Sequence, residues 1–298
     1  MPKPVQIESL ENRFVSSTHQ QIIKRISEAV VNANIHLSTS VEAIVSQEME
    51  KGDKKLIVKT TNGNFEFDEV VVTIPLGCLK LDTLQFHPNL PQNISQAITD
   101  ASYGRLEKVF VAFAAPFWER SETDASQGGD TYPMFTHFLR PTYALEEQRL
   151  WTLEMLAVSS TALFGAHAQP LLVFHLWRAA AAHVTSAIAS LTPSSDEYYI
   201  VINTLFQPFY SRLPNYKEDC PDCAPTAVLA TKWQNDELAG NGSYTNFTTH
   251  YCGGPLKGDP AIHDGIRAMR HGLPERGLWF AGEHTAPFVA LGTSTGAY

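Results

Sequence analysis

The feature that most constrains the fold is an uninterrupted apolar run, Val70-Val71-Val72-Thr73-Ile74, that ends at Pro75. A strand with one solvated face alternates apolar and polar residues, whereas a strand covered on both faces reads as a continuous β-branched run. We therefore expect residues 70–74 to form a central strand of a sheet that helices cover. A similar run, Leu278 to Gly282, returns near the end of the chain.

The residues before this strand predict one helix and a small antiparallel meander. Thr18 to Val31 has apolar residues at helical spacing and charged residues between them, which is typical of an amphipathic helix. Turn dipeptides then separate short β-branched runs. We expect the strands at residues 35–37, 41–47, 55–61, 64–67 and 69–74.

The middle of the chain, residues 80–228, has a different character and predicts a separate α+β unit. Strands are expected at 108–114 and 150–156, and helices at 178–191 and 196–207. We expect a surface loop at 121–130 and an irregular connection at 208–225. The chain thus divides into residues 1–79, 80–228 and 229–298, of which the first and last belong together.

Charge and cysteine content exclude several functions. Lys plus Arg is 22 and Asp plus Glu is 31, which gives a net charge of −9, so we expect no nucleic-acid partner. The sequence has no signal-peptide core and no apolar run long enough to span a bilayer, so we expect an intracellular, cytoplasmic protein. Cys220 and Cys223 form a pair without a second ligand pair, and we interpret them as loop cysteines rather than a metal site.

The segment Gly292-Thr293-Ser294-Thr295-Gly296 fits the G-x-S-x-G pattern of serine hydrolases. In that fold the acid and the histidine follow the serine, but only Gly296, Ala297 and Tyr298 follow here. Glycines and small hydroxyls at a strand-to-helix turn also permit close approach of a cofactor to the backbone. We therefore favour a cofactor turn over a nucleophile elbow.

Two segments together carry a family resemblance. Ala281-Gly282-Glu283-His284-Thr285 follows the second buried strand, and Gly292 to Ala297 follows it in turn. In combination they resemble the carboxyl-terminal flavin-binding signature of the flavin-containing amine oxidases, the family of polyamine oxidases, monoamine oxidases and histone lysine demethylases. Residues 35–44, 70–80, 105–118 and 233–244 resemble four further family segments in the family's order.

The resemblance assigns roles to individual residues. It implies that the FAD cofactor contacts Val41, Pro75, Leu76, Glu283, Thr293 and Ser294. Lys108 matches the family's active-site lysine, which is held through water to the flavin N5 and assists reaction with oxygen. Tyr244 matches one wall of its aromatic cage, and Trp233 is a second candidate wall.

The residue types at these positions suit amine oxidation on physical grounds as well. Aromatic walls orient an amine without engaging its lone pair. Lys108 is flanked by apolar residues on a predicted buried strand, where an unpaired lysine is costly, so a structural role is unusual for it. We expect Glu107, the preceding residue, to point to the opposite face and to be solvated.

The resemblance implies a fold of mixed α/β and α+β class. It consists of an incomplete Rossmann-like FAD-binding domain with a β-meander, formed by residues 1–79 and 229–298, and an α+β substrate domain, residues 80–228. The implied reaction passes a hydride from the amine carbon to the flavin N5 and gives an imine, then an aldehyde, with oxygen converted to hydrogen peroxide. We expect a small amine or a polyamine as substrate.

One family element is not found in the sequence. No G-x-G-x-x-G turn, which holds the FAD pyrophosphate, is present. We therefore expect a fragment of an amine oxidase that by itself binds FAD poorly and is inactive. The alternative is a non-catalytic remnant that acts as a protein-binding module.

Overall fold

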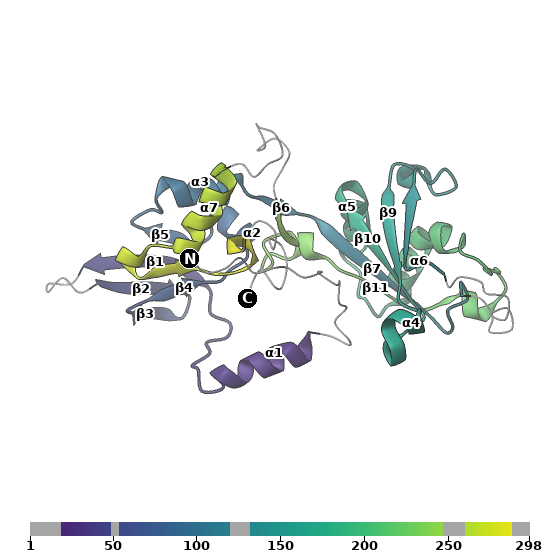
Figure 1. Cartoon of the computed structure of the whole chain (residues 1–298), viewed down its shortest axis with the longest axis horizontal. Helices are drawn as coiled ribbons and strands as arrows, with labels where there is room; N and C mark the ends of the chain where they lie inside the picture. Colours follow the sequence, from purple (N-terminus) through teal and green to yellow (C-terminus); the bar gives the residue numbers. More distant parts are fainter. Residues whose placement is uncertain (1–18, 49–53, 120–131, 247–259, 288–298) are drawn as a thin grey trace, which may run out of the picture.

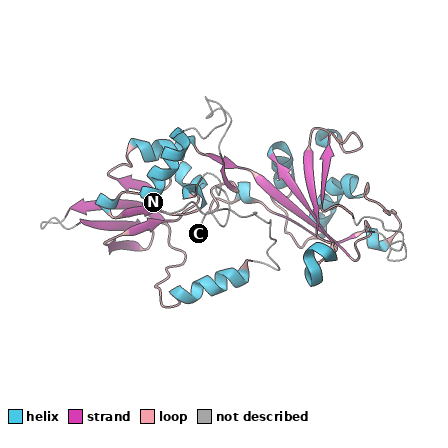
Figure 2. Ribbon diagram, in the orientation of Figure 1, coloured by secondary structure: helices cyan, strands magenta, loops and turns pink. Residues whose placement is uncertain are grey.

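The computed structural model describes residues 19–48, 54–119, 132–246 and 260–287. Its strands and helices form two groups, each with its own hydrophobic core. Figure 1 shows that the long strands β7 and β11 run from one group toward the other. The mixed α/β and α+β class expected from the sequence is confirmed (Figure 2).

The first group contains a four-stranded sheet in the order β3-β2-β1-β5. Its strands are β1 (Val41–Glu48), β2 (Lys54–Thr60), β3 (Gly63–Phe67) and β5 (Gln85–His87). The first three pair antiparallel, which confirms the meander for these strands, and β5 joins β1 in parallel. The strand predicted at residues 69–74 is not part of this sheet. The predicted strand at residues 35–37 is wrong, because this segment is irregular.

A second, two-stranded sheet pairs β4 (Val70–Val72) in parallel with β13 (Leu278–Phe280). The two apolar runs that the sequence places far apart are therefore neighbours. The expectation that β4 is buried on both faces is wrong for the described residues, since Val71 is 56% exposed while Val72 is buried. Within the described chain β4 pairs with β13 alone, and its core contacts lie on the Val72 side.

Three helices complete the first core: α2 (Leu76–Lys80), α3 (Gln92–Asp100) and α7 (Pro260–His271). Lys80 fixes α2 against α3, because its ammonium donates to the carbonyls of Ile98 (2.9 Å), Thr99 (2.7 Å) and Ala101 (2.8 Å) at the end of α3. A cation at a helix carboxyl end satisfies carbonyls that have no partner within the helix. The 3₁₀ turn η7 (Pro274–Arg276) leads into β13.

The second group is a five-stranded antiparallel sheet in the order β11-β7-β10-β9-β8. Its strands are β7 (Leu106–Phe113), β8 (Phe135–Leu139), β9 (Thr152–Ala157), β10 (Leu171–Trp177) and β11 (Pro225–Ala230). β7 and β9 confirm the two predicted strands, whereas β8, β10 and β11 were not predicted. The expected loop at 121–130 lies outside the described residues.

Two helices pack on one face of this sheet and form the second core with it: α5 (Arg178–Ala187) and α6 (Asp196–Tyr210). Both were predicted, but α6 continues through Pro208, where the sequence analysis placed the start of an irregular connection. Its amino end is capped by Ser195, whose hydroxyl accepts from the Tyr198 amide. Shorter elements are α4 (Thr161–Phe164) and the 3₁₀ turns η3 (Glu146–Gln148), η4 (Gly165–His167) and η5 (Pro221–Cys223).

The cores show where the chain passes from one group to the other. Ile94, Ile98 and Ala101 belong to the first core, and the second begins at Val109, so the chain crosses after Ala101 rather than near residue 80. The reason is that α3 packs on α7. At the crossing, β6 (Ser102–Gly104) pairs antiparallel with β12 (Tyr244–Asn246).

The predicted amphipathic helix is present as α1 (Gln20–Ser27), extended by the 3₁₀ turn η1 (Glu28–Val30). None of its residues is buried, and Figure 1 shows it apart from both groups. Its apolar side chains Ile22, Ile23 and Ile26 are exposed. Among the described residues, no helix has the length and apolar character needed to cross a membrane.

Candidate active site

The candidate cofactor residues Pro75, Leu76 and Glu283 lie at one edge of the β4–β13 pair. Because these strands are parallel, their carboxyl ends meet at the same edge, and each of these residues follows one of those ends. Ligands of open α/β sheets bind outside the carboxyl ends of the strands. Gly282 makes the turn there with φ 143°, a conformation that favours glycine.

Glu283 opens the 3₁₀ turn η8 (Glu283–Thr285), and its carboxylate is engaged by β12. The Thr245 amide lies 3.2 Å from both carboxylate oxygens, and the Thr245 hydroxyl donates to Oε1 at 2.5 Å. Thr245 is the residue after Tyr244 on the same strand. The structure therefore connects the predicted cofactor acid to the strand that carries the predicted aromatic wall.

His284 is buried beside this turn and has an unsatisfied nitrogen. Within the described chain its Nε2 has no hydrogen-bond partner. Burial lowers the pKa of the ring to about 4, because the charged form cannot be solvated there. The imidazole is therefore neutral at physiological pH, and Nε2 is free to bind a ligand group.

A contact between glycines holds the two groups together next to this edge. A Cβ added to Gly77 would lie 2.1 Å from the Gly240 carbonyl oxygen, and Gly240 itself has φ 74°. Tyr103 closes the contact, since its hydroxyl donates to the Ala239 carbonyl at 2.8 Å. Burial, followed by the nearby Glu283 carboxylate, raises the pKa of Tyr103 to about 12, so this hydroxyl keeps its proton.

Tyr244 borders a pocket of about 770 Å³ between β6, β12 and the start of α5. Tyr103 and Trp177 supply further aromatic surface, and Arg105 and Arg178 supply two positive charges. Arg178 has φ 50°, in the left-handed region that non-glycine residues rarely adopt. Among the described residues, none that lines this pocket is acidic.

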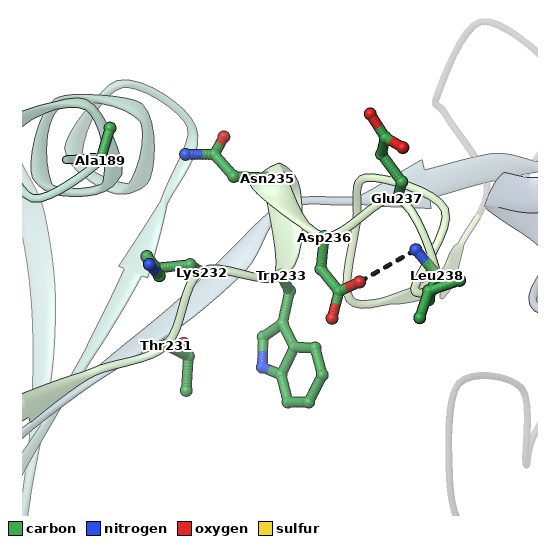
Figure 3. Close-up of a pocket in the computed structure, with 8 residues that line it drawn as sticks. All are labelled: Ala189, Thr231, Lys232, Trp233, Asn235, Asp236, Glu237 and Leu238. Atoms are coloured by element: carbon green, nitrogen blue, oxygen red, sulfur yellow. Dashed lines mark hydrogen bonds between the residues drawn. The ribbon is translucent and has the colours of Figure 1, made fainter. Parts of the chain in front are cut away.

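Trp233 lies in a different pocket, of about 670 Å³, shown in Figure 3. It opens the 3₁₀ turn η6 (Trp233–Asn235), and its side chain is 46% exposed. The Asp236 carboxylate accepts from the Leu238 amide at 2.9 Å and shapes the following turn (Figure 3). Tyr244 and Trp233 therefore do not share a pocket within the described residues.

Glu107 corrects a prediction, because it is buried rather than solvated. Its side chain is 0% exposed and lies on the core face of β7. Its carboxylate accepts from the Thr231 hydroxyl at 2.5 Å and from the Gln234 amide at 2.9 Å, and the Gln234 side chain continues the network to Thr185 on α5. Glu107 thereby fixes the turn that carries Trp233.

Lys108 consequently lies on the other face of β7 and is only partly buried. This face is not covered by α5 and α6, whose core contacts involve Val109, Val111 and Phe113. Glu107 was predicted to be solvated because the rest of β7 is apolar on both faces. The alternation of residues along the strand therefore did not reveal which of the two charged residues points into the core. Lys108 borders neither the Tyr244 pocket nor the Trp233 pocket.

Among the remaining cofactor candidates, Val41 is not brought to the edge that holds Glu283. Val41 begins β1 and pairs with Thr60 in the four-stranded sheet, and its side chain is exposed. Thr293 and Ser294 lie outside the described residues, as does the rest of the glycine-rich segment. Cys220 and Cys223 are free thiols in and before η5, consistent with loop cysteines.

Sequence reasoning missed three residues that shape the site: Tyr103, Gly240 and Thr245. Gly240 lies within the segment 233–244 that carried the resemblance, and Thr245 directly follows it, so their position in the chain was a usable signal. No signal in the sequence pointed to Tyr103, because its contact with residues 239–242 joins distant parts of the chain.

The residues at the β4–β13 edge fit a flavin nucleotide. Gly282 leaves the backbone accessible where a Cβ would crowd the His284 ring at 2.9 Å. The unpartnered His284 Nε2 provides a hydrogen-bonding group for an absent ligand. Glu283 supplies a carboxylate acceptor at the same edge.

Comparison with known proteins identifies the family of the chain. Residues 11–292 match the family described as "Flavin containing amine oxidoreductase". Lysine-specific histone demethylase 1 homolog 3 of Arabidopsis thaliana is 33% identical over 36% of this chain and 7% of its own length. The corticosteroid-binding protein of Candida albicans is 24% identical over 97% of this chain and 57% of its own.

Solved structures show the same fold. Cyclohexylamine oxidase from Brevibacterium oxydans aligns with a TM-score of 0.57 and 18% identity, and a redesigned putrescine oxidase with 0.59 and 16%. Each alignment covers 93% of this chain but 49% of the solved chain, so this chain spans about half the length of these proteins. The chain belongs to the flavin-containing amine oxidoreductase family, whose cofactor is FAD.

Proposed function

We propose that this chain is part of an enzyme that oxidises an amine with FAD and releases hydrogen peroxide. The observation that carries the proposal is the link between Glu283 and Thr245, which joins the edge that fits a flavin to the strand that carries Tyr244. Family membership over residues 11–292 supports the same chemistry.

In this proposal Pro75, Glu283 and the neutral His284 hold the cofactor, and Leu76 contributes only its backbone, because its side chain is buried in the first core. FAD, when bound, would supply the redox chemistry, as acceptor for the hydride of the amine carbon and as reductant for oxygen, which gives peroxide. The protein orients the amine and excludes water. Tyr244 forms an apolar wall that leaves the amine lone pair free, and Lys108 supplies a proton-bearing cation on the open face of the sheet.

The charges around Tyr244 favour a small monoamine over a polyamine. Arg105 and Arg178 border the pocket, and the lining residues that the structure describes include no acidic side chain. Two guanidinium groups repel a second ammonium of the substrate. Probable polyamine oxidase 4 of Arabidopsis thaliana is nevertheless 35% identical over 26% of this chain, so a polyamine is the comparison substrate for the assay.

We further propose that the complete enzyme includes a dinucleotide-binding segment in addition to these 298 residues. The support is that no G-x-G-x-x-G turn occurs in the sequence, that Val71 of β4 is exposed, and that the solved relatives are about twice as long as the aligned part. The chain alone is then expected to bind FAD weakly.

The test is to produce the chain with and without its natural flanking sequence and to measure flavin absorbance and amine-dependent peroxide release. Benzylamine and spermine serve as the monoamine and the polyamine. Peroxide from the longer protein with benzylamine supports the proposal. A longer protein that binds flavin but releases no peroxide with either amine refutes the proposed reaction.

A second candidate function is non-catalytic binding. It is favoured by the exposed apolar side chains of α1 and by the relative named a corticosteroid-binding protein, which aligns over 97% of this chain. Binding of a protein partner to α1 would be abolished by Ile23→Asp, and binding of a steroid would be detected by tritiated corticosterone. Either result in a protein that lacks peroxide release would favour this function.

A further inference from the structure

Four polar side chains form a row across the open face of the five-stranded sheet. His175 on β10 is directly opposite Lys108 on β7 and directly opposite Glu154 on β9. Glu154 is in turn opposite His137 on β8. Side chains that are directly opposite across strands have Cβ atoms about 5 Å apart. Figure 1 shows β7, β10 and β9 side by side in this sheet.

Hydrogen bonds join three members of the row and fix one ring. The Glu154 carboxylate lies 2.9 Å from His175 Nδ1 and 3.0 Å from His137 Nε2, with a different oxygen in each contact. An ionised carboxylate only accepts, so each imidazole donates its N–H to it. Neutral His175 therefore carries its proton on Nδ1, and its Nε2 is a bare acceptor on the side of the ring away from β9.

The neighbour of His175 on that side is Lys108, whose ammonium only donates. Within three positions of the row along the chain, the other charged residues are Arg105, Arg140 and Arg178, all cations, together with Glu107, which lies on the opposite face of β7. Glu154 is thus the carboxylate of this row. The side chains of His175, Glu154 and His137 are 15%, 25% and 55% exposed, so solvent screens the His175 end least.

Two histidines and a glutamate could also bind a metal ion, but the positions of these three side chains disfavour a metal site. Within the described part of the chain, no three His, Cys, Asp or Glu side chains converge on a position that a metal ion could occupy. The two imidazoles instead bind separate oxygens of one carboxylate. The arrangement is a chain of hydrogen bonds that runs along the sheet.

We propose that Glu154 and His175 are positioning residues for Lys108. No hydrogen bond joins Lys108 to His175 among the described contacts; the bare Nε2 of His175 is the acceptor that an N–H of the Lys108 ammonium meets when this side chain turns toward β10, and the Glu154 carboxylate fixes the ring and strengthens that bond through its negative charge. A lysine side chain has four rotatable bonds, so such an acceptor is needed to hold its head group in one place. The inference rests on the proposed role of Lys108 in amine oxidation.

Two measurements on the folded chain without flavin test the inference. The first is the tautomer of His175, read from imidazole ¹⁵N shifts, which we expect to be the Nδ1–H form. The second is the rate at which acetic anhydride labels Lys108, relative to exposed Lys59, followed by mass spectrometry. An ammonium held by an acceptor is labelled more slowly than a free side chain.

We expect His175→Phe and Glu154→Gln each to raise the relative labelling of Lys108 about threefold, because either change removes or reorients the acceptor. His137→Gln is the matched control, since it leaves the His175–Glu154 bond in place, and its labelling should equal that of the unaltered chain. Equal labelling in all four proteins, or His175 with its proton on Nε2, would overturn the inference.

The same design separates this inference from the proposed function. If labelling changes as expected but Lys108→Met leaves peroxide release by the complete flavoprotein unaltered, the positioning of Lys108 stands and its role in the reaction fails. If Lys108→Met abolishes peroxide release while labelling is the same in every variant, the role stands and the positioning fails.

Discussion

The carboxylate of Glu283 accepts two kinds of hydrogen bond from Thr245, one from the backbone amide and one from the hydroxyl. The two residues come from different strands and different ends of the site: Glu283 follows β13, and Thr245 lies on β12 next to Tyr244. This contact fixes the β4–β13 edge, which fits a flavin, relative to Tyr244, the candidate aromatic wall. Its loss should therefore affect both.

Thr245→Val should lower the free energy of unfolding by about 1.5 kcal/mol, because a buried bond to a charged group is lost. Thr245 is 2% exposed, so water cannot replace the missing donor. Urea unfolding of the variant measures the effect. Thr152→Val on the exposed side of β9 is the control and should stay within about 0.5 kcal/mol; a similar loss in both variants would contradict the prediction.

The buried His284 should make the protein less stable at acidic pH. Its pKa is about 4 in the folded state and about 6.5 in the unfolded state, so below pH 6.5 the unfolded chain takes up a proton that the folded chain does not. Stability from this group is complete above pH 6.5 and decreases as the pH falls toward 4. Between pH 7.5 and 5 the loss is about 2 kcal/mol.

Urea unfolding of His284→Gln at the two pH values checks this expectation. The variant cannot titrate at this position, so it should lose about 2 kcal/mol less than the unaltered chain on going from pH 7.5 to 5. His167→Gln, at an exposed position, should show the original pH dependence. An identical pH dependence for all three proteins would show that His284 is not buried in its neutral form.

Gly77→Ala should disrupt the junction between the two groups. The added methyl group would lie 2.1 Å from the Gly240 carbonyl oxygen, which is backbone and cannot rotate away. We expect a loss of about 3 kcal/mol, as for severe overpacking. Gly165→Ala has open space around it and only an unfavourable φ of 55°, so a loss of about 1 kcal/mol is expected there. Equal losses would argue against the contact.

Substitution of two adjacent residues on β7 should change the stability of the protein by very different amounts. Glu107→Leu leaves the Gln234 amide and the Thr231 hydroxyl without their acceptor in the core, and should cost about 3 kcal/mol. Lys108→Met, on the open face, should change stability by no more than about 0.5 kcal/mol. Unfolding in urea distinguishes the two, and the reverse order would restore the assignment made from sequence.

The sequence predicted those elements whose signals are local. The apolar run at Val70 and the helix from Asp196 were both recognised, because β-branched composition and helical spacing depend only on neighbouring residues. β10 was missed because Leu171 to Trp177 is apolar on both faces and leads directly into α5, which hides the boundary.

Parts of the site depend on contacts between distant residues, and these could not be predicted. Glu283 was identified from its position after a buried strand, but its partner Thr245 follows from the pairing of β12 with β6. The face of β7 that carries Glu107 is decided by helices α5 and α6 from later in the chain. The apolar pattern of β7 is the same on both faces, and the prediction placed the Glu107 face toward solvent, which is wrong.

The most direct test of the account is the flavin absorbance of the protein produced with its natural flanking sequence, recorded without oxygen before and after addition of benzylamine. We expect a bound flavin whose absorbance near 450 nm falls on addition of the amine and returns when oxygen is admitted. A protein that contains no flavin, or a bound flavin that neither benzylamine nor spermine bleaches, would contradict it.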